Sequence, residues 1–112
     1  MRRAFLLAAA VGLVLAAPAA TAGRKKVGVY DNYYLPNKLT VPKGTTIVWQ
    51  WPAEVGDVHD VKLGKHPKGA KTFWSEPGAS GYSFTRKLTV PGTYRIVCTL
   101  HEEMTMTITV KK

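Results

Sequence analysis

One short segment, residues 98–104, contains the side chains best suited to metal chemistry. It holds Cys98, which is the only cysteine, together with His101 and Met104, one of three histidines and one of three methionines. A thiolate, an imidazole and a thioether are ligand types that soft and borderline metals prefer, copper above all. Strand-like hydrophobic sequence flanks the segment on both sides. The segment therefore predicts a metal loop that closes a β-hairpin.

A second histidine, His59, can complete the ligand set from upstream. It follows a loop at the start of a strand-like stretch, whereas Cys98 ends a series in which alternate residues face inward. If these two strand ends meet at one end of the fold, His59, Cys98, His101 and Met104 converge. Two imidazoles, a thiolate and a long axial thioether form a blue-copper electron-transfer site. Such a site has no open position for a substrate, which argues against hydrolytic catalysis.

The single cysteine rules out a disulfide within the chain. A free thiol in an oxidising compartment is a liability unless it is buried or ligated. A lone buried cysteine is most often a small core residue, but the neighbouring His101 and Met104 favour metal ligation of Cys98. His66, beside Pro67 in a lysine-rich stretch, is interpreted as a solvated surface histidine, with a weak accessory metal contact as the alternative.

Strands of about six residues must position these ligands, since no stretch shows a helical period of useful length. Turn signals recur roughly every ten residues. The pattern predicts an all-β sandwich or barrel of seven to eight strands. Residues 64–81 are expected to form a long loop with at most one turn of helix. The clearest strand-like segments are 27–30, 39–41, 45–51, 58–63, 82–88, 93–98 and 105–110.

Residues 1–22 are predicted to be a secretory signal peptide. Arg2 and Arg3 precede an apolar run over residues 4–17, which is too short to span a bilayer, and small residues follow at 20–22. The paired arginines leave open whether export is by the general secretory or the twin-arginine route. An uncleaved anchor helix is the alternative. Cleavage leaves one domain, residues 23–112, in the periplasm or outside the cell, and loss of the two arginines lowers the formal charge from +9 to +7.

The sequence resembles the cupredoxin family, small blue copper proteins such as plastocyanin and amicyanin, over nearly all of residues 23–112. The match is strongest at residues 98–104. By this resemblance the fold is a Greek-key β-sandwich, and copper is held by His59, Cys98 and His101 in the equatorial plane with Met104 as the axial ligand. The resemblance also implies that Asp60 ties its loop to the cysteine loop through Thr99. The other matching stretches are 27–32, 39–45, Trp49, 59–61 and 91–94.

Two departures from the family pattern affect the ligand loop. Glu102 and Glu103 fill positions where the family often has glycine or proline, and Met106 stands where a glycine is common. Met106 also satisfies the longer histidine-to-methionine spacing of plastocyanin-type loops. Met104 is favoured as the axial ligand with Met106 as a core residue, and the reverse assignment remains the alternative.

The predicted function is that of a secreted, monomeric type 1 copper protein that shuttles single electrons between unidentified redox partner proteins. It is not predicted to be an enzyme or to bind nucleic acid. His101, in a loop at the end of the domain, is the expected electron port by resemblance. The alternatives are a copper carrier, storage or sensing module that uses the same ligands, and an immunoglobulin-like interaction domain without metal.

Charge is unevenly distributed along the chain. Five of the seven acidic residues lie in or beside the two ligand loops, although the chain as a whole is basic. We hypothesise that this acidic end steers a partner that carries a basic patch; simple loop solvation is the alternative. The lysines at 62, 65, 68 and 71 are interpreted as a solvated face, with docking of an acidic partner as the alternative. The five acids are Glu54, Asp57, Asp60, Glu102 and Glu103.

Overall fold

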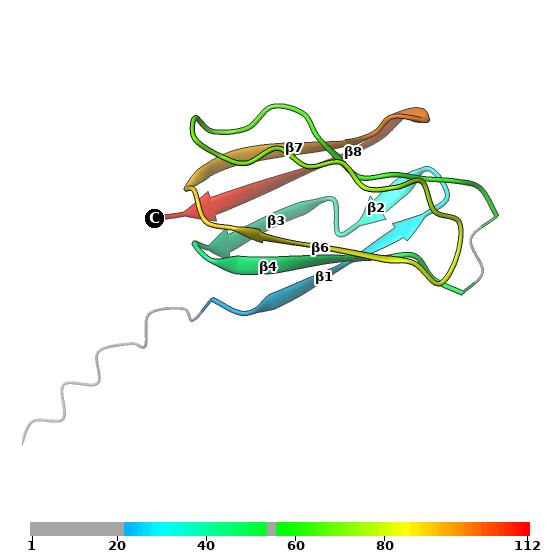
Figure 1. Cartoon of the computed structure of the whole chain (residues 1–112), viewed down its shortest axis with the longest axis horizontal. Coiled ribbons are helices and arrows are strands. Elements are labelled where there is room, and N and C mark those ends of the chain that lie inside the picture. Colours follow the sequence, from blue (N-terminus) through cyan, green and yellow to red (C-terminus); the bar gives the residue numbers. More distant parts are fainter. Residues whose placement is uncertain (1–21, 54–55) are drawn as a thin grey trace, which may run out of the picture.

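Two four-stranded β-sheets make up the fold (Figure 1). The computed structural model describes residues 22–53 and 56–112, and within this part the chain has eight strands and no helix. The prediction of an all-β fold with seven to eight strands is confirmed. The signal peptide predicted for residues 1–22 lies outside the described residues, apart from Ala22. No helix in the described ranges could cross a membrane.

The first sheet has the strand order β2-β1-β4-β6 and the second the order β3-β8-β7-β5. Two neighbouring pairs are parallel, β1 with β4 and β3 with β8, and the remaining pairs are antiparallel. The strands are β1 (Arg24–Tyr30), β2 (Tyr33–Leu35), β3 (Lys38–Pro42), β4 (Thr45–Gln50), β5 (Lys62–Leu63), β6 (Ser83–Leu88), β7 (Gly92–Cys98) and β8 (His101–Lys111).

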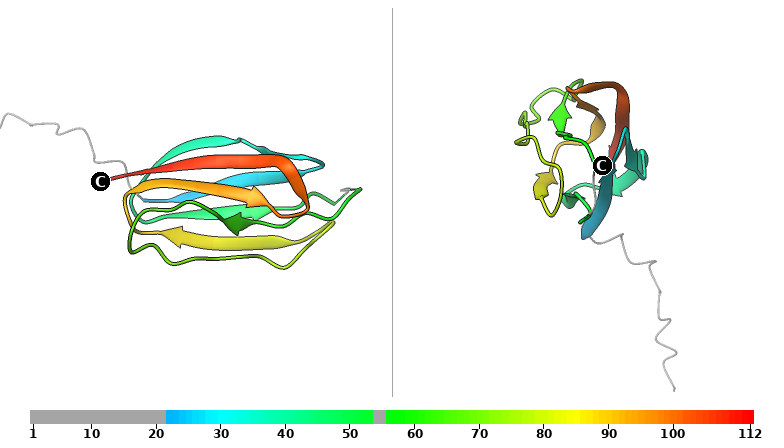
Figure 2. Two further views of the ribbon diagram at one scale, coloured as in Figure 1. Left: turned by 90° about the horizontal axis from the view of Figure 1, so that it is seen from above. Right: turned by 90° about the vertical axis from the view of Figure 1, so that its right-hand side faces the viewer.

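The core forms between the inward faces of the two sheets, and the strands surround it when the molecule is viewed along its long axis (Figure 2). Along β7 and β8 every second residue is buried, as the two-residue period of a strand requires. The largest side chains in this core are those of Trp49, Trp51, Tyr34 and Tyr94, and each is almost fully buried. The core therefore extends between the two sheets up to the end of β7 and the start of β8.

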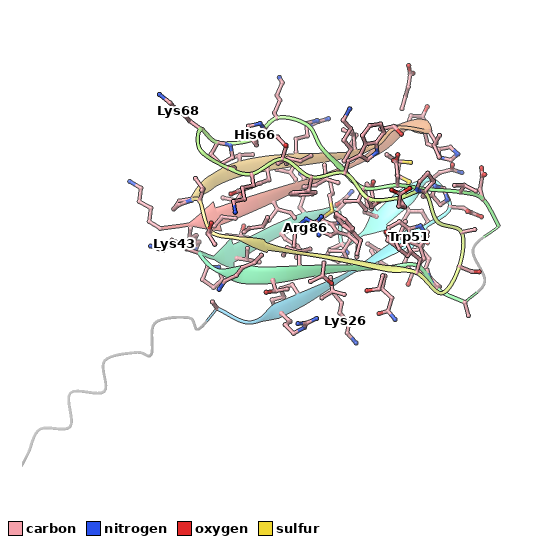
Figure 3. The ribbon with its side chains drawn as sticks, in the orientation of Figure 1. Lys26, Lys43, Trp51, His66, Lys68 and Arg86 are labelled. Carbon is pink, nitrogen blue, oxygen red and sulfur yellow. The ribbon has the colours of Figure 1, made fainter. Side chains whose placement is uncertain are left out.

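Three connections meet at the end of the sandwich opposite the C-terminus (Figure 1): the β1–β2 turn, the β7–β8 turn and the segment that leads from β4 towards β5. Asn32 in the β1–β2 turn has a φ of 69°, a left-handed conformation in which asparagine is enriched. Figure 3 places Trp51 near this end and Lys43 and Lys68 near the other. The candidate ligands from distant parts of the sequence come together here.

Two expectations about the ligand segments need correction. The strand expected over residues 58–63 is only β5, because the backbone of His59 pairs instead with Gly78 in an isolated bridge. His101 was expected in a loop, with the next strand over residues 105–110, but β8 already begins at His101. The long loop expected over residues 64–81 is confirmed, and no helical turn is found in it.

Candidate metal centre

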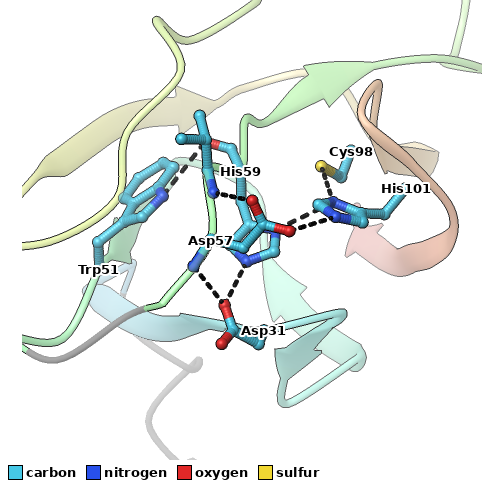
Figure 4. Close-up of polar contacts among 7 residues, drawn as sticks. Asp31, Trp51, Asp57, His59, Cys98 and His101 are labelled. Atoms are coloured by element: carbon cyan, nitrogen blue, oxygen red, sulfur yellow. Dashed lines mark hydrogen bonds and ion pairs between the residues drawn. The ribbon is translucent and has the colours of Figure 1, made fainter.

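Three of the predicted ligands, His59, Cys98 and His101, lie together at this end of the sandwich (Figure 4). Their donor atoms all fall within 4.8 Å of one another. The two histidines face each other through their Nδ1 atoms at 3.2 Å, and Cys98 Sγ lies 3.6 Å from His101 Nδ1. The arrangement presents two imidazole nitrogens and one sulfur to a common point, and it could hold a metal ion.

Backbone hydrogen bonds hold His59 in place. Its N–H donates to Gly78 O and its carbonyl accepts from Gly78 N–H, each at 2.9 Å. The same carbonyl accepts a hydrogen bond of 3.2 Å from the indole Nε1 of Trp51. His59 is fully buried. These bonds hold the imidazole at the rim of the core, where one edge faces the other ligands.

Cys98 and His101 are brought together by an irregular hairpin. The β7–β8 ladder is regular as far as Val97, which pairs with Thr105, but the next pair is Cys98 with His101. Residues 102–104 therefore form a bulge on β8, which lets the chain turn back towards Cys98. Cys98 is buried, whereas the side chain of His101 retains 23% of its exposure. His101 is thus the ligand candidate that reaches the surface.

The outer nitrogen of each histidine contacts a carboxylate. His59 Nε2 lies 2.9 Å from Asp31 Oδ1, and His101 Nε2 lies 3.1 Å from Asp57 Oδ2. Asp31 Oδ1 also accepts from the backbone N–H of Asp57 at 3.1 Å, which links the two aspartate residues. The hydrogen bond from His59 is the main reason that the pKa of Asp31 lies below its usual value. For Asp57, the N–H of Val58 contributes most to the lowered pKa, followed by His101.

These contacts show that the site fits a cation. A carboxylate at Nε2 stabilises the tautomer that carries its proton there, which leaves the lone pair on Nδ1. In that tautomer the lone pairs of His59 and His101 face each other at 3.2 Å and repel, and a proton or a metal ion between them removes the repulsion. Burial raises the pKa of the Cys98 thiol, and a nearby metal ion reverses that preference because it favours the thiolate. Copper matches this set of nitrogen and sulfur donors.

A second set of hydrogen bonds connects the two ligand segments. Asp60, next to His59, accepts a hydrogen bond of 2.7 Å from the backbone N–H of Thr99, next to Cys98, and a further bond from the Thr99 hydroxyl. Asp60 also accepts from the indole Nε1 of Trp74 at 2.9 Å. Burial alone raises the pKa of Asp60, but these hydrogen bonds outweigh it and the pKa lies below its usual value. The predicted link between Asp60 and Thr99 is confirmed.

The two methionines of β8 occupy different places. Both are buried on the inward face. Met104 belongs to the bulge between His101 and Thr105, whereas Met106 is in the regular ladder and pairs with Ile96. The sulfur of Met106 accepts a hydrogen bond of 3.3 Å from Trp49 Nε1. Met106 thus has the surroundings of a core residue, and Met104 is the methionine nearer to His101 along β8.

The remaining candidates divide clearly. His66 is exposed and its Nδ1 lies 2.9 Å from Pro67 O, outside the cluster, as expected of a surface histidine. Asp57, Glu102 and Glu103 are exposed at the metal end, whereas Asp60 is buried and Glu54 lies outside the described residues. Asp31 was missed because Asp31 and Asn32 read only as a turn. The sequence shows a carboxylate in this turn, but its contact with His59 depends on how the β1–β2 turn packs against the ligand segments.

The comparisons with known proteins identify the family. A model described as copper binding proteins of the plastocyanin/azurin family matches residues 24–111. The chain belongs to this family, so the resemblance to cupredoxins is confirmed and copper is the cofactor that the cluster could hold. No curated protein sequence matches the chain.

Solved structures with the same fold include both small proteins and a domain of an enzyme. A pseudoazurin from Sinorhizobium meliltoi is 22% identical with a TM-score of 0.67, over 80% of this chain and 75% of that one. The Cu(I) form of an amicyanin variant is 23% identical with a TM-score of 0.68, over 81% and 85%. A copper-containing nitrite reductase from Thermus scotoductus SA-01 is 25% identical with a TM-score of 0.68 over 78% of this chain, which spans only 22% of the reductase.

Proposed function

We propose that the protein is a type 1 copper electron carrier whose ligands are His59, Cys98, His101 and Met104. The observation that carries this proposal is the convergence of two histidine Nδ1 atoms and one cysteine sulfur, with both Nε2 atoms taken up by carboxylates. Copper bound there supplies a one-electron couple between Cu(I) and Cu(II). Four protein ligands leave no position for a substrate, which favours a carrier over an enzyme.

The residues around the site hold the ligands in one arrangement. His59 is fixed through its backbone bonds to Gly78, and its ring is fixed by Asp31. Cys98 lies at the end of the core strand β7, and the adjoining Thr99 is bound to Asp60. A packed core permits little relaxation of such side chains. Both oxidation states therefore experience nearly the same ligand positions, which keeps the reorganisation that accompanies electron transfer small.

His101 provides the contact between the site and a partner. Its side chain is the only exposed member of the three-residue cluster, and it lies beside a shallow hollow lined by Asn32, Glu102 and Glu103. A redox protein that covers this hollow approaches within contact distance of a ligand ring. A partner with a basic docking surface fits best, because the rim around His101 is acidic.

We also propose that the chain is exported and that residues 23–112 form the mature domain. The basic start at Arg2 and Arg3, the apolar run over residues 4–17 and the small residues at 20–22 support cleavage after Ala22. Export into an oxidising compartment is compatible with a single thiol that is buried and ligated. Mass spectrometry of the protein from the exported fraction tests this, and an intact N-terminus would contradict cleavage.

Copper reconstitution of the purified domain tests the function. One equivalent of Cu(II) is expected to give an intense blue thiolate-to-copper absorption band and reversible one-electron electrochemistry. Cys98→Ser should abolish the band, whereas Cu(II) added to His66→Ala should give it unchanged. Absence of the band in the wild-type protein would overturn the copper site. A band combined with slow electron exchange and easy loss of copper would instead identify a copper carrier.

A further inference from the structure

An exposed tryptophan marks a second surface of the molecule. Trp74 lies in the long segment between β5 and β6 and retains 59% of its exposure. Among the described residues, no other large hydrophobic side chain is more exposed. Its backbone forms an isolated bridge with Lys62, and the Lys62 ammonium lies 4.5 Å from the centre of the indole ring. A large aromatic side chain held at the surface is a common anchor of protein–protein interfaces.

Trp74 is connected to the metal centre by hydrogen bonds. Its indole Nε1–H donates to Asp60 Oδ2 at 2.9 Å, and Asp60 Oδ1 accepts from the backbone N–H of Thr99 at 2.7 Å. Thr99 follows Cys98 directly. A continuous path of covalent and hydrogen bonds therefore runs from the surface indole to the cysteine sulfur. Electronic coupling falls off less steeply along such bonds than across open space.

The surroundings of Trp74 are basic. Lys62 and Arg86 line one shallow hollow together with Trp74, and Lys71 and Arg86 line the neighbouring one. None of these three cations forms an ion pair with a carboxylate of the described residues. Glu76 is the one exposed acid close by in the sequence. Figure 3 shows Arg86 on the flank of the sandwich, between the end that carries Trp51 and the end that carries Lys43.

We infer that this surface, the Trp74 face (Lys62, Lys71, Trp74 and Arg86), docks an acidic electron-transfer protein at a site separate from the acidic rim around His101. Carboxylates of such a partner complement the cations, and its edge covers the exposed indole. The inference rests on the proposed copper function. In the docked pair one electron moves: the partner is oxidised by one electron as the bound copper goes from Cu(II) to Cu(I). Trp74 and Asp60 keep their own oxidation states.

Binding of an anionic probe tests the surface without any electron transfer. The probe is hexacyanocobaltate, a redox-inactive anion, titrated into isotope-labelled protein in the Cu(I) form and followed by NMR. The indole N–H of Trp74 and the amides around Lys62 and Arg86 are expected to shift, with the signals at the His101 rim unchanged. Lys62→Glu should abolish the shifts, whereas Lys43→Glu, the same charge change at the far end, should leave them. Shifts spread evenly over all lysines would overturn the inference.

Reaction rates with two small complexes test the path. Reduction by hexacyanoferrate, an anion, is expected to slow at least about threefold in Lys62→Glu and in Trp74→Leu, whereas reduction by hexaammineruthenium, a cation, stays unchanged. Trp74→Phe keeps an aromatic ring but loses the hydrogen bond to Asp60. Its rate with hexacyanoferrate should therefore lie between that of the wild type and that of Trp74→Leu. Lys43→Glu is the matched control. If the variants keep their blue band and react with hexacyanoferrate as fast as this control, the docking face is wrong and the copper function stands.

Discussion

The sulfur atoms of Met104 and Met106 differ in their surroundings, although both side chains point into the same core from β8. Met106 Sδ accepts the indole N–H of Trp49, and Trp49 is fully buried. Among the described residues no such donor is found for Met104 Sδ, which stays free for a metal. The family spacing alone left both methionines as candidates, and this contact favours Met104 as the proposed axial ligand.

Replacing each methionine by leucine should therefore affect different properties, stability for Met106 and the copper spectrum for Met104. In the metal-free protein Met106→Leu leaves the Trp49 N–H unpaired, and the free energy of unfolding should fall by about 1–3 kcal/mol. Met104→Leu conserves volume and should cost less than about 1.5 kcal/mol. In the copper protein only Met104→Leu should change the visible spectrum and raise the reduction potential. Urea unfolding and voltammetry measure the two effects, and a changed spectrum in Met106→Leu alone would reverse the assignment.

If copper binds as proposed, Asp31 and Asp57 act on it through His59 and His101, which they contact. Removing a partner of this kind commonly lowers metal affinity by about 10–100-fold. Asp31→Ala and Asp57→Ala should both weaken copper binding in a competition with a chelator, Asp31→Ala more strongly because His59 is fully buried. Asp57→Ala should also broaden the spin-resonance signal as the ring of His101 becomes mobile. Glu103→Ala, an exposed carboxylate at the same end, is the control, and equal losses in all three variants would indicate a general charge effect.

At the scale of elements, the site depends on two segments that are far apart in the sequence. The β7–β8 hairpin supplies Cys98 and His101 through its bulge, and the segment before β5 supplies His59. Asp60 joins them by accepting the N–H and the hydroxyl of Thr99. The bulge alone does not fix the distance between His59 and the hairpin. The hydrogen bonds of Asp60 therefore complete the ligand geometry.

Asp60→Ala should loosen this junction. The variant leaves Thr99 N–H and Trp74 Nε1 without an acceptor, and the free energy of unfolding should fall by about 1–3 kcal/mol. Copper affinity should fall as well, because Cys98 and His59 lose their common restraint. Combining Asp60→Ala with Thr99→Val in a double-mutant cycle should show a coupling of about 0.5–3 kcal/mol. A coupling near zero would mean that the two segments are held in place independently.

The sequence predicted the parts of this arrangement that follow from local pattern. Two-residue alternation placed Tyr94, Ile96 and Cys98 on one face, and family spacing selected His59 as the distant ligand. Alternation does not say which backbone groups pair. The strand at 58–63 was therefore predicted too long, and the bulge near the start of β8 was missed. The role of Asp31 depends on the β1–β2 turn lying against the ligand loops, a contact that no local pattern encodes.

The charge of the whole molecule is divided between a basic body and an acidic rim. Asp31, Asp57, Glu102 and Glu103 are exposed around His101, in a chain with a formal charge of +9. Asp60 was expected to belong to this acidic end, but its carboxylate is buried and hydrogen-bonded. Asp31 is exposed there instead. A charged rim around the exposed ligand steers an approaching partner of opposite sign.

Charge reversal at the rim tests the steering. Glu102→Lys with Glu103→Lys should slow the reaction of the Cu(II) protein with reduced hexaammineruthenium by roughly tenfold at low salt, because the rim then repels the cation. The decline of the rate with ionic strength should flatten, since screening acts on an attraction that the variant has lost. Lys43→Glu with Lys111→Glu changes as many charges at the far end and should leave both the rate and its salt dependence near those of the wild type. If the rim variant behaves as this control does, the carboxylates around His101 serve only to solvate the loop, and partner choice lies with other surfaces.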